Sequence, residues 1–135
     1  MRHHIFTSGL SGEMPAIGVM GLIDINVRAV ESVVLVEVNG RIDSMNANQL
    51  GAALEQAIDE PPSLSVQIVL DLSAVDYMSS AGLREIVSSL KKAKRVQGDL
   101  RIAQPSERVR EVMEMAGLDT IFQIYGSLDE AVNSF

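Results

Sequence analysis

The chain has 135 residues, a formal net charge of −7 at pH 7 and a hydrophobic fraction of 47%, which suits one domain with a substantial core. It contains no cysteine, so disulfides, thiol catalysis and zinc–thiolate sites are excluded. The negative charge argues against nucleic acid as the main partner, and every apolar run is too short to span a membrane.

The first part of the chain, residues 1–21, is rich in Gly, Ser, Met and Pro and has no sustained hydrophobic periodicity. We expect a flexible tail there, followed by a domain over residues 22–135. Glycines and a proline interrupt any apolar segment of the tail, which disfavours a secretory signal peptide. The only histidines, His3 and His4, lie in the tail, so a His-dependent catalytic triad is not expected in the domain.

The domain begins with a predicted β-hairpin. Apolar and polar residues alternate over residues 23–29, as in a half-buried strand, and a second strand is predicted over residues 33–38. Glu31 and Ser32 make a short turn, so the two strands should pair antiparallel. The Asn-Gly dipeptide at residues 39–40 is expected to end the second strand.

Helices and strands alternate in the rest of the domain. The expected strands cover residues 66–72, 100–103 and 120–125, and the expected helices follow Asp43 or Ser44, Ser79–Ser80, Pro105–Ser106 and Ser127. Gly98 and Gly117 are expected to end the second and third helices, Gly98 in the left-handed conformation. The order β-β-α-β-α-β-α-β-α predicts an α/β fold with a mixed, mostly parallel sheet of about five strands and four helices.

One stretch, residues 71–83, places two serines where an apolar strand leads, after a short connection, into a helix. The N-terminus of a helix presents unpaired N–H groups and the positive end of the helix dipole, which favour a phosphate. Serine is also a preferred residue for capping a helix. Ser79 and Ser80 therefore either cap the helix or form a phosphorylation switch.

Four segments, taken in order, resemble the STAS domain and more narrowly the bacterial anti-sigma factor antagonists, also called anti-anti-sigma factors. They are an opening strand at residues 23–27, a G-x-[LI]-D element at 40–43, a strand, loop and phosphorylation-site helix at 70–83, and a late helix stop at 115–118. The resemblance extends from about Leu22 to the C-terminus and implies a STAS-like fold.

Antagonists of this family bind an anti-sigma factor and thereby release a sigma factor, which regulates transcription. The anti-sigma factor is often a GHKL-type serine kinase that phosphorylates the antagonist, and a serine phosphatase resets the switch. The resemblance therefore implies a cytoplasmic phosphoprotein of bacterial signalling that acts through protein–protein contacts. It also implies a monomer or weak dimer with no cofactor and no catalytic residues.

The family's phosphorylation site usually reads M-D-S-[ST]-G-L, and residues 78–83 of this chain read M-S-S-A-G-L. Residue by residue, Ser80 falls on the phosphoacceptor, Ser79 replaces the usual aspartate, and Ala81 replaces the second hydroxyl residue. The resemblance implies phosphorylation of Ser80, with Ser79 as the alternative acceptor.

A partner-binding surface that contains Asp43, Ser79, Ser80 and Gly82 also follows from the resemblance. Asp43 matches a family aspartate near the phosphorylation site, and it is equally a suitable N-cap for its own helix. Gly82 either permits the close approach of a partner's backbone or serves only the geometry that joins the loop to the helix.

Other functions have less support in the residues. Asp71 and Asp76 suit strand-end and turn positions better than a metal site, and the basic residues 91–95 suit a solvated helix end. The sequence has neither a P-loop nor a G-x-G-x-x-G motif, and no base is identifiable for either serine, so we do not expect an enzyme. The alternatives are a STAS subunit of another complex, such as a lipid-transport ATPase or a stressosome-like assembly, and a nucleotide-binding module.

Overall fold

The computed structural model describes residues 23–135, so the tail predicted for residues 1–21 lies outside the described residues. The strands are β1 (Asp24–Val30), β2 (Val33–Ile42), β3 (Gln67–Met78), β4 (Asp99–Ala103) and β5 (Ile124–Tyr125), and the helices are α3 (Ala47–Asp59), α4 (Ser80–Arg95), α5 (Glu107–Met115) and α6 (Leu128–Asn133), with a short 3-10 helix η1 (Leu118–Thr120). The strands form one sheet in the order β1-β2-β3-β4-β5, in which β1 pairs antiparallel with β2 and the other pairs are parallel. The predicted α/β fold class and order of elements are confirmed.

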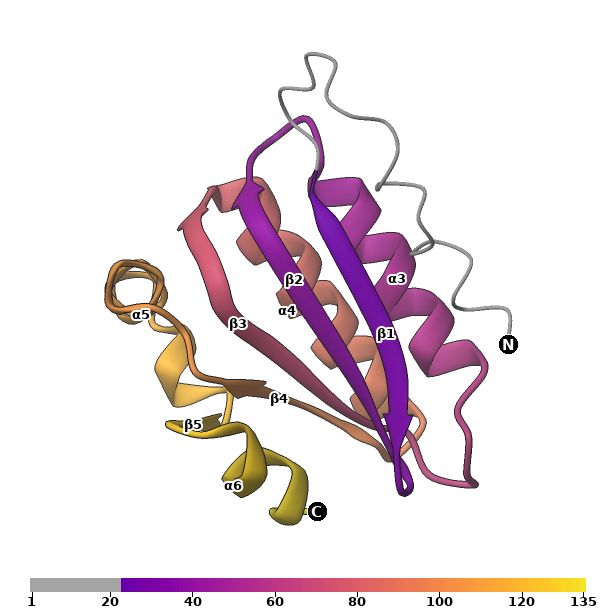
Figure 1. Ribbon diagram of the computed structural model, residues 1–135. Helices are drawn as coiled ribbons and strands as arrows, with labels where there is room; N and C mark the ends of the chain where they lie inside the picture. The colour runs from indigo at the N-terminus through magenta and orange to yellow at the C-terminus, as the bar shows by residue number, and fades with distance from the viewer. Residues whose placement is uncertain (1–22) are drawn as a thin grey trace.

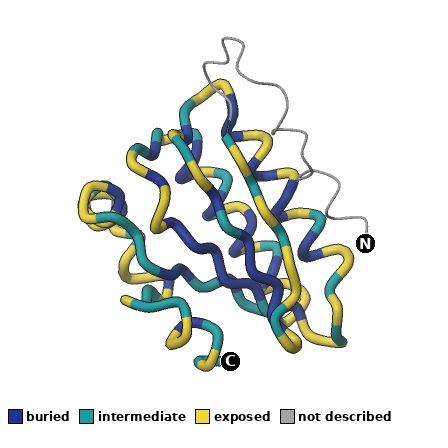
Figure 2. The backbone as a smooth tube through the Cα atoms, in the orientation of Figure 1, coloured by how far each residue is buried: buried dark blue, intermediate teal, exposed yellow. Residues whose placement is uncertain are grey.

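Helices cover the sheet on both faces. α3 and α4 pack against each other on one face, behind the strands in Figure 1. Val34 and Val36 of β2 join the larger core beneath α3, α4 and α5, whereas Val33 and Leu35 point to the opposite face and pack with α6. Figure 2 shows the buried stretches of chain in the lower middle of the sheet. Burial on both faces explains why β3 begins as an almost continuous apolar run.

Two strands extend further than the sequence predicts. β2 continues through Gly40 to Ile42, and β3 continues through the expected short connection to Met78. The two strands stay paired through shifts of register near Asn39 and Gly40, and Gly40 has a φ of 124°. The prediction that the Asn-Gly dipeptide ends β2 is therefore wrong, because an irregular but continuous parallel pairing holds both polar segments in the sheet.

The end of α4 also differs from the prediction, whereas the end of α5 does not. Gln97, with a φ of 63°, takes the left-handed position that ends α4, and the N–H of Gly98 donates to the carbonyl of Ala93 at 2.7 Å. Glycine is required at position 98 for a steric reason instead, because a Cβ there would lie 2.3 Å from the carbonyl oxygen of Val66. Gly117 ends α5 as predicted, with a φ of 76°.

The strand predicted over residues 120–125 shrinks to the two residues of β5. η1 occupies the beginning of this segment, where the N–H of Thr120 donates to the carbonyl of Gly117 at 3.3 Å. Phe122 follows in a buried position in the larger core. The apolar residues of the segment therefore serve core packing as part of a turn, which a short apolar pattern does not distinguish from a strand.

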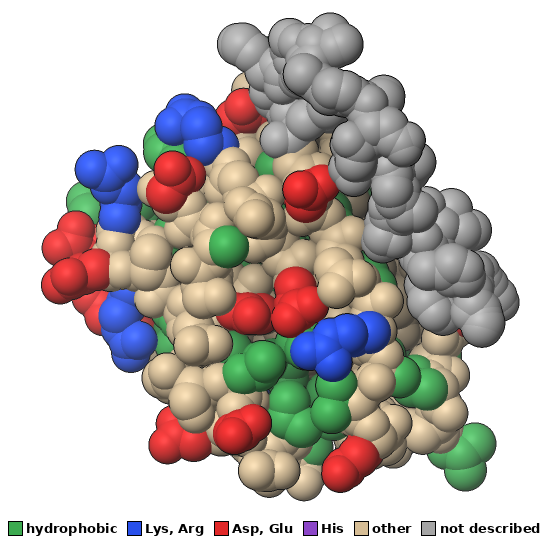
Figure 3. Space-filling model, in the orientation of Figure 1, with side chains coloured by type: hydrophobic (Ala, Val, Ile, Leu, Met, Phe, Trp, Pro, Cys, Tyr) green, Lys and Arg blue, Asp and Glu red, His purple; other side chains and the backbone are tan. Residues whose placement is uncertain are grey.

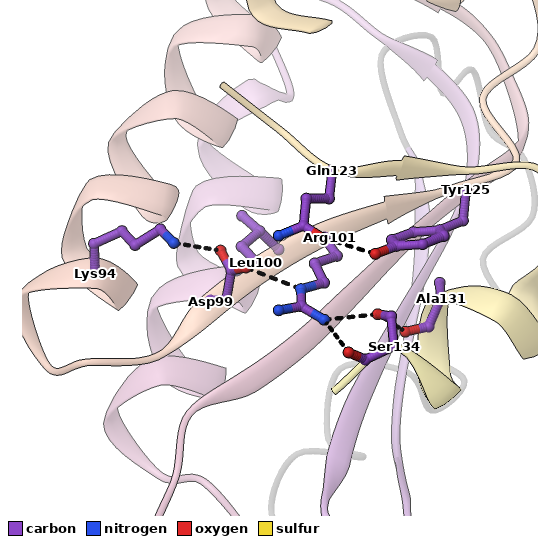
Figure 4. A network of polar contacts seen from close by, with 8 residues as sticks. All are labelled: Lys94, Asp99, Leu100, Arg101, Gln123, Tyr125, Ala131 and Ser134. Atoms are coloured by element: carbon purple, nitrogen blue, oxygen red, sulfur yellow. Dashed lines mark hydrogen bonds and ion pairs between the residues drawn. The ribbon is translucent and has the colours of Figure 1, made fainter. Parts of the chain in front are cut away.

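Arg101 of β4 anchors the C-terminal helix to the sheet (Figure 4). Its Nη1 donates to the backbone carbonyl of Ser134 at 2.6 Å and to the Ser134 hydroxyl at 2.7 Å, and its guanidinium lies 4.0 Å from the ring centre of Phe135. Its Nε donates to Asp99 at 2.9 Å, and Lys94 of α4 forms an ion pair with the same carboxylate at 3.3 Å. This network joins α4, β4 and the chain end after α6.

Candidate functional site

The candidate site lies where the parallel strands β2 and β3 end. Ile42 and Met78 are register partners, and the N–H of Ser79 donates to the carbonyl of Ile42 at 2.8 Å. Asp43 and Ser79 therefore follow directly on neighbouring strand ends. The structure brings together two segments that are more than thirty residues apart and that both carry predicted site residues.

Ser79 caps helix α4. It occupies the N-cap position in an extended conformation, and its hydroxyl oxygen accepts a hydrogen bond from the N–H of Gly82 at 3.2 Å. This contact satisfies one of the unpaired N–H groups at the start of the helix. Of the two roles that the sequence left open for the serine pair, the capping role falls to Ser79.

Ser80 is the first residue of α4 and is exposed. Its hydroxyl faces solvent, and no other group within residues 23–135 hydrogen-bonds to it. The first turn of the helix carries no acidic residue, so nothing there offsets the positive end of the dipole. A phosphate on this hydroxyl would lie in solvent at a position that favours negative charge.

Asp43 organises the turn that precedes α3, and the half-buried carboxylate accepts hydrogen bonds from the N–H groups of Met45 at 2.9 Å and Asn46 at 3.1 Å. The N–H of Asp43 in turn donates to the side-chain oxygen of Asn46 at 2.9 Å. The helix begins at Ala47, and Asn46 occupies its N-cap position without a side-chain cap hydrogen bond. The prediction that Asp43 or Ser44 caps the helix directly is therefore corrected, because the Asp43 carboxylate caps the turn before the helix.

Asn46 is a site residue that the sequence interpretation missed. It is fully buried, and its side-chain nitrogen donates to the carbonyl of Arg41 at 2.8 Å, which ties the turn to the end of β2. Asp43 and Asn46 exchange hydrogen bonds as in a capping box. The three-residue spacing of these two capping-type side chains is the sequence signal that could have indicated Asn46. The orientation of Asp43 thus depends on a buried amide.

Gly82 is buried at the start of α4. A Cβ at this position would lie 2.6 Å from Cγ2 of Ile42 and 2.7 Å from the sulfur of Met78. The glycine therefore lets the helix start pack tightly on the ends of β2 and β3. This close approach is made within the chain itself, and the predicted contact of Gly82 with a partner stays a prediction.

Acidic side chains lie near the middle of the face seen in Figure 3, beside a basic side chain. Asp24, Glu37 and Asp71 line a shallow depression there. Glu37 accepts from the side-chain amide of Asn26 at 2.9 Å, and Asp71 accepts from the N–H of Ser73 at 3.0 Å. In the part of the chain that the structure describes, no group of three or more acidic or histidine residues is arranged to hold a metal ion.

The basic run at the end of α4 is partly paired within the domain. Lys92 forms an ion pair with Glu55 of α3 at 3.0 Å, and Lys94 pairs with Asp99 at 3.3 Å. These contacts agree with the predicted role as a solvated helix end. Among the helices of residues 23–135, none is long and apolar enough to cross a membrane.

The family match decides how this arrangement is classified. The STAS domain family matches residues 24–131, which is most of the chain. The chain belongs to the STAS domain family. The confirmed order of elements and the serine pair at the start of α4 agree with the resemblance found in the sequence.

Relatives of this STAS protein carry the names of regulators. BtrV of Bordetella bronchiseptica, named as a candidate anti-sigma factor antagonist, is 35% identical over 106 residues, which cover 78% of this chain and 89% of that protein. The anti-sigma-B factor antagonist of Bacillus subtilis is 29% identical over 102 residues, which cover 76% of this chain and 90% of that protein.

A solved structure supports the same relationship. The crystal structure of an anti-sigma factor antagonist from Mycobacterium paratuberculosis superposes with a TM-score of 0.75 at 28% identity, covering 87% of this chain and 97% of that one. The STAS fold is therefore shared over nearly the whole length of that antagonist.

Proposed function

We propose that this STAS protein is an anti-sigma factor antagonist, which binds an anti-sigma factor and so releases a sigma factor. The observation that carries the proposal is the division of roles between the two serines. Ser79 uses its hydroxyl to cap α4, whereas Ser80 presents an exposed hydroxyl at the first position of the same helix. The names of the relatives support the same function.

Phosphorylation of Ser80 regulates this binding. The partner is a GHKL-type serine kinase, in which the Ser80 hydroxyl oxygen attacks the γ-phosphorus of bound ATP. The new oxygen–phosphorus bond forms as the bond to the β,γ-bridging oxygen breaks, ADP leaves, and the hydroxyl proton passes to a base of the kinase. A serine phosphatase hydrolyses the phosphoserine with water and releases inorganic phosphate. The antagonist supplies the acceptor and acts in the cytoplasm without catalysis of its own.

A phosphate at this position acts on the interface and not on the fold. It adds a charge of about −1.5 to −2 at pH 7. The exposed position and the helix N-terminus tolerate that charge within the domain. A partner surface packed against Ser80, with Asp43 on the neighbouring strand end, meets added charge and bulk. Release of the partner follows from this difference.

Binding measurements with purified partners test the proposal. Each GHKL-type anti-sigma factor of the source organism is titrated calorimetrically with wild type, Ser80→Ala and Ser80→Asp. We expect one of them to bind wild type and Ser80→Ala with equal affinity and Ser80→Asp at least about tenfold more weakly. Equal binding of all three variants would contradict regulation at Ser80, and no binding at all would contradict the antagonist function.

The acceptor is tested separately by incubation with the bound kinase and ATP, followed by mass spectrometry. We expect phosphate on Ser80 in wild type and in Ser79→Ala. Phosphate on Ser79 alone would assign the switch to the alternative acceptor.

A third experiment tests whether Asp43 contacts the partner. Asp43→Asn keeps a side-chain acceptor for the turn but removes the charge. Unchanged partner affinity in that variant would remove Asp43 from the interface.

A further inference from the structure

An open groove runs from Ser80 along α4 to the turn after α5, with a volume of about 610 Å³. Its lining consists of Ser80, Leu83, Arg84, Glu85, Val87, Ser88, Lys91, Ala116 and Leu118. Apolar side chains from two helical segments thus lie beside the candidate phosphoacceptor. We call this surface the α4 groove.

Arg84 is the arginine that lines the α4 groove. It lies four residues after Ser80 on α4, which puts both side chains on the same helix face, one turn apart. It is exposed, and within residues 23–135 it forms no ion pair. In contrast, Lys92 and Lys94 of the same helix both have acidic partners in the domain.

The charge of the groove differs from that of the whole chain. The groove is lined by Arg84 and Lys91 against the single carboxylate of Glu85, whereas the chain has a net charge of −7. Glu85 reaches toward α3, since its carboxylate oxygen lies 2.0 Å from the place of a Cβ on Gly51. A local excess of positive charge beside apolar side chains complements a segment that carries a carboxylate next to an apolar side chain.

A phosphate on Ser80 would be within reach of the same arginine. A guanidinium binds phosphate and carboxylate oxygens through the same planar set of N–H donors, so one group competes with the other. Residues at positions i and i+4 of a helix pair readily. The phosphate would therefore occupy Arg84 within the chain and withdraw it from any partner.

Resting on the proposed function, we infer that Arg84 is the second component of the switch. It binds a carboxylate of the anti-sigma factor in the α4 groove when Ser80 is unmodified, and it binds the phosphate when Ser80 is phosphorylated. Release of the partner then has two causes, the charge added at Ser80 and the cation lost at Arg84.

The first test concerns the phosphate and needs no partner. Full-length protein with phosphoserine incorporated at position 80 is titrated by phosphorus NMR, alone and with Arg84→Gln or Arg95→Gln. Arg95 is the matched control, because it is an exposed arginine of α4 outside the groove lining. We expect Arg84→Gln to raise the second pKa of the phosphate by about 0.5 and Arg95→Gln to leave it nearly unchanged. Equal effects of the two variants would overturn the inference.

The second test concerns the partner and uses the anti-sigma factor that binds wild type in the titrations above. We expect Arg84→Gln to weaken binding of the unmodified protein about fivefold or more, with less than a twofold effect of Arg95→Gln. Phosphorylation should also reduce affinity by a smaller factor in Arg84→Gln than in wild type. Binding of wild type together with unchanged binding of Arg84→Gln would overturn the inference and leave the antagonist function standing.

A failure of the proposed antagonist function can also be told apart from a failure of the inference about Arg84. If none of the kinases binds wild type, the antagonist function fails and the docking of a carboxylate fails with it. The phosphorus titration still decides whether Arg84 holds the phosphate. Circular dichroism and urea unfolding confirm that both arginine variants are folded, as expected for exposed residues.

Discussion

The hydroxyl groups of two adjacent serines face different surroundings. The Ser79 hydroxyl accepts from a backbone N–H at 3.2 Å, whereas the Ser80 side chain is exposed at the next position. The distinction arises from a single step along the chain, because the N-cap lies outside the helix and the first helical residue lies within it. The Ser79 hydroxyl therefore has a structural role, whereas the Ser80 hydroxyl is accessible to a modifying enzyme.

This division predicts different costs for removing the two hydroxyls. Ser79→Ala should lower the free energy of unfolding by about 1 kcal/mol, because a helix N–H loses its partner. Ser80→Ala should change it by less than about 0.5 kcal/mol, because an exposed hydroxyl is removed. Urea unfolding followed by circular dichroism measures both values. A larger loss for Ser80→Ala than for Ser79→Ala would reverse the assigned roles.

The tight packing around Gly82 predicts that a larger residue there is destabilising for a steric reason, which helix propensity alone would not predict. Gly82→Ala should lower the free energy of unfolding by about 1–3 kcal/mol, because the new methyl group collides with Ile42 and Met78. Gly51→Ala in α3 is the matched comparison, because the side chain it meets is the flexible end of Glu85. That variant should be neutral or more stable by up to about 1 kcal/mol. Equal behaviour of the two variants in urea unfolding would contradict the tight packing at Gly82.

At the scale of elements, α6 depends on contacts with β4. This helix has six residues, too few to be stable alone, and only Ala131 within it is buried. Arg101 holds the chain end after it through Ser134 and Phe135. Loss of this arginine should therefore free the helix from the sheet face that it covers.

Arg101→Gln should lower the free energy of unfolding by about 2 kcal/mol, because charge-assisted hydrogen bonds to Ser134 are lost. In this variant, amide hydrogen exchange in α6 should be faster than in wild type, and the increase should be larger than any increase in α4. The control is Arg110→Gln, which removes an exposed helix ion pair with Glu114 and should cost less than about 0.5 kcal/mol. Unchanged exchange in α6 after loss of Arg101 would show that apolar packing alone holds the helix.

At the scale of the whole molecule, the part of the chain that the structure describes, residues 23–135, contains two hydrophobic clusters and a five-stranded sheet. A chain that begins at Leu22 should therefore unfold at the same urea concentration as the full chain. It should also bind the anti-sigma factor with the same affinity. A lower midpoint of unfolding, or a loss of affinity greater than about twofold, would assign residues 1–21 a role in the domain or the interface.

The sequence by itself determined the order of elements, the family and the serine pair. These features depend on local patterns, since hydrophobic periodicity, helix caps and a short motif are complete within a few residues. Gly117 and Ser127 illustrate this, because each acts at the helix end that the sequence predicts.

The resemblance named Asp43, Ser79, Ser80 and Gly82 as one surface, but only the tertiary structure decided how these residues are brought together. The pairing of Ile42 with Met78 extends both strands, places Asp43 beside Ser79 and requires the space at Gly82. The groove that contains Arg84 likewise needs α4 and the turn after α5 to be neighbours. The physical reason is that strand pairing and burial join segments far apart in the chain, and their outcome depends on neighbours that no local pattern specifies.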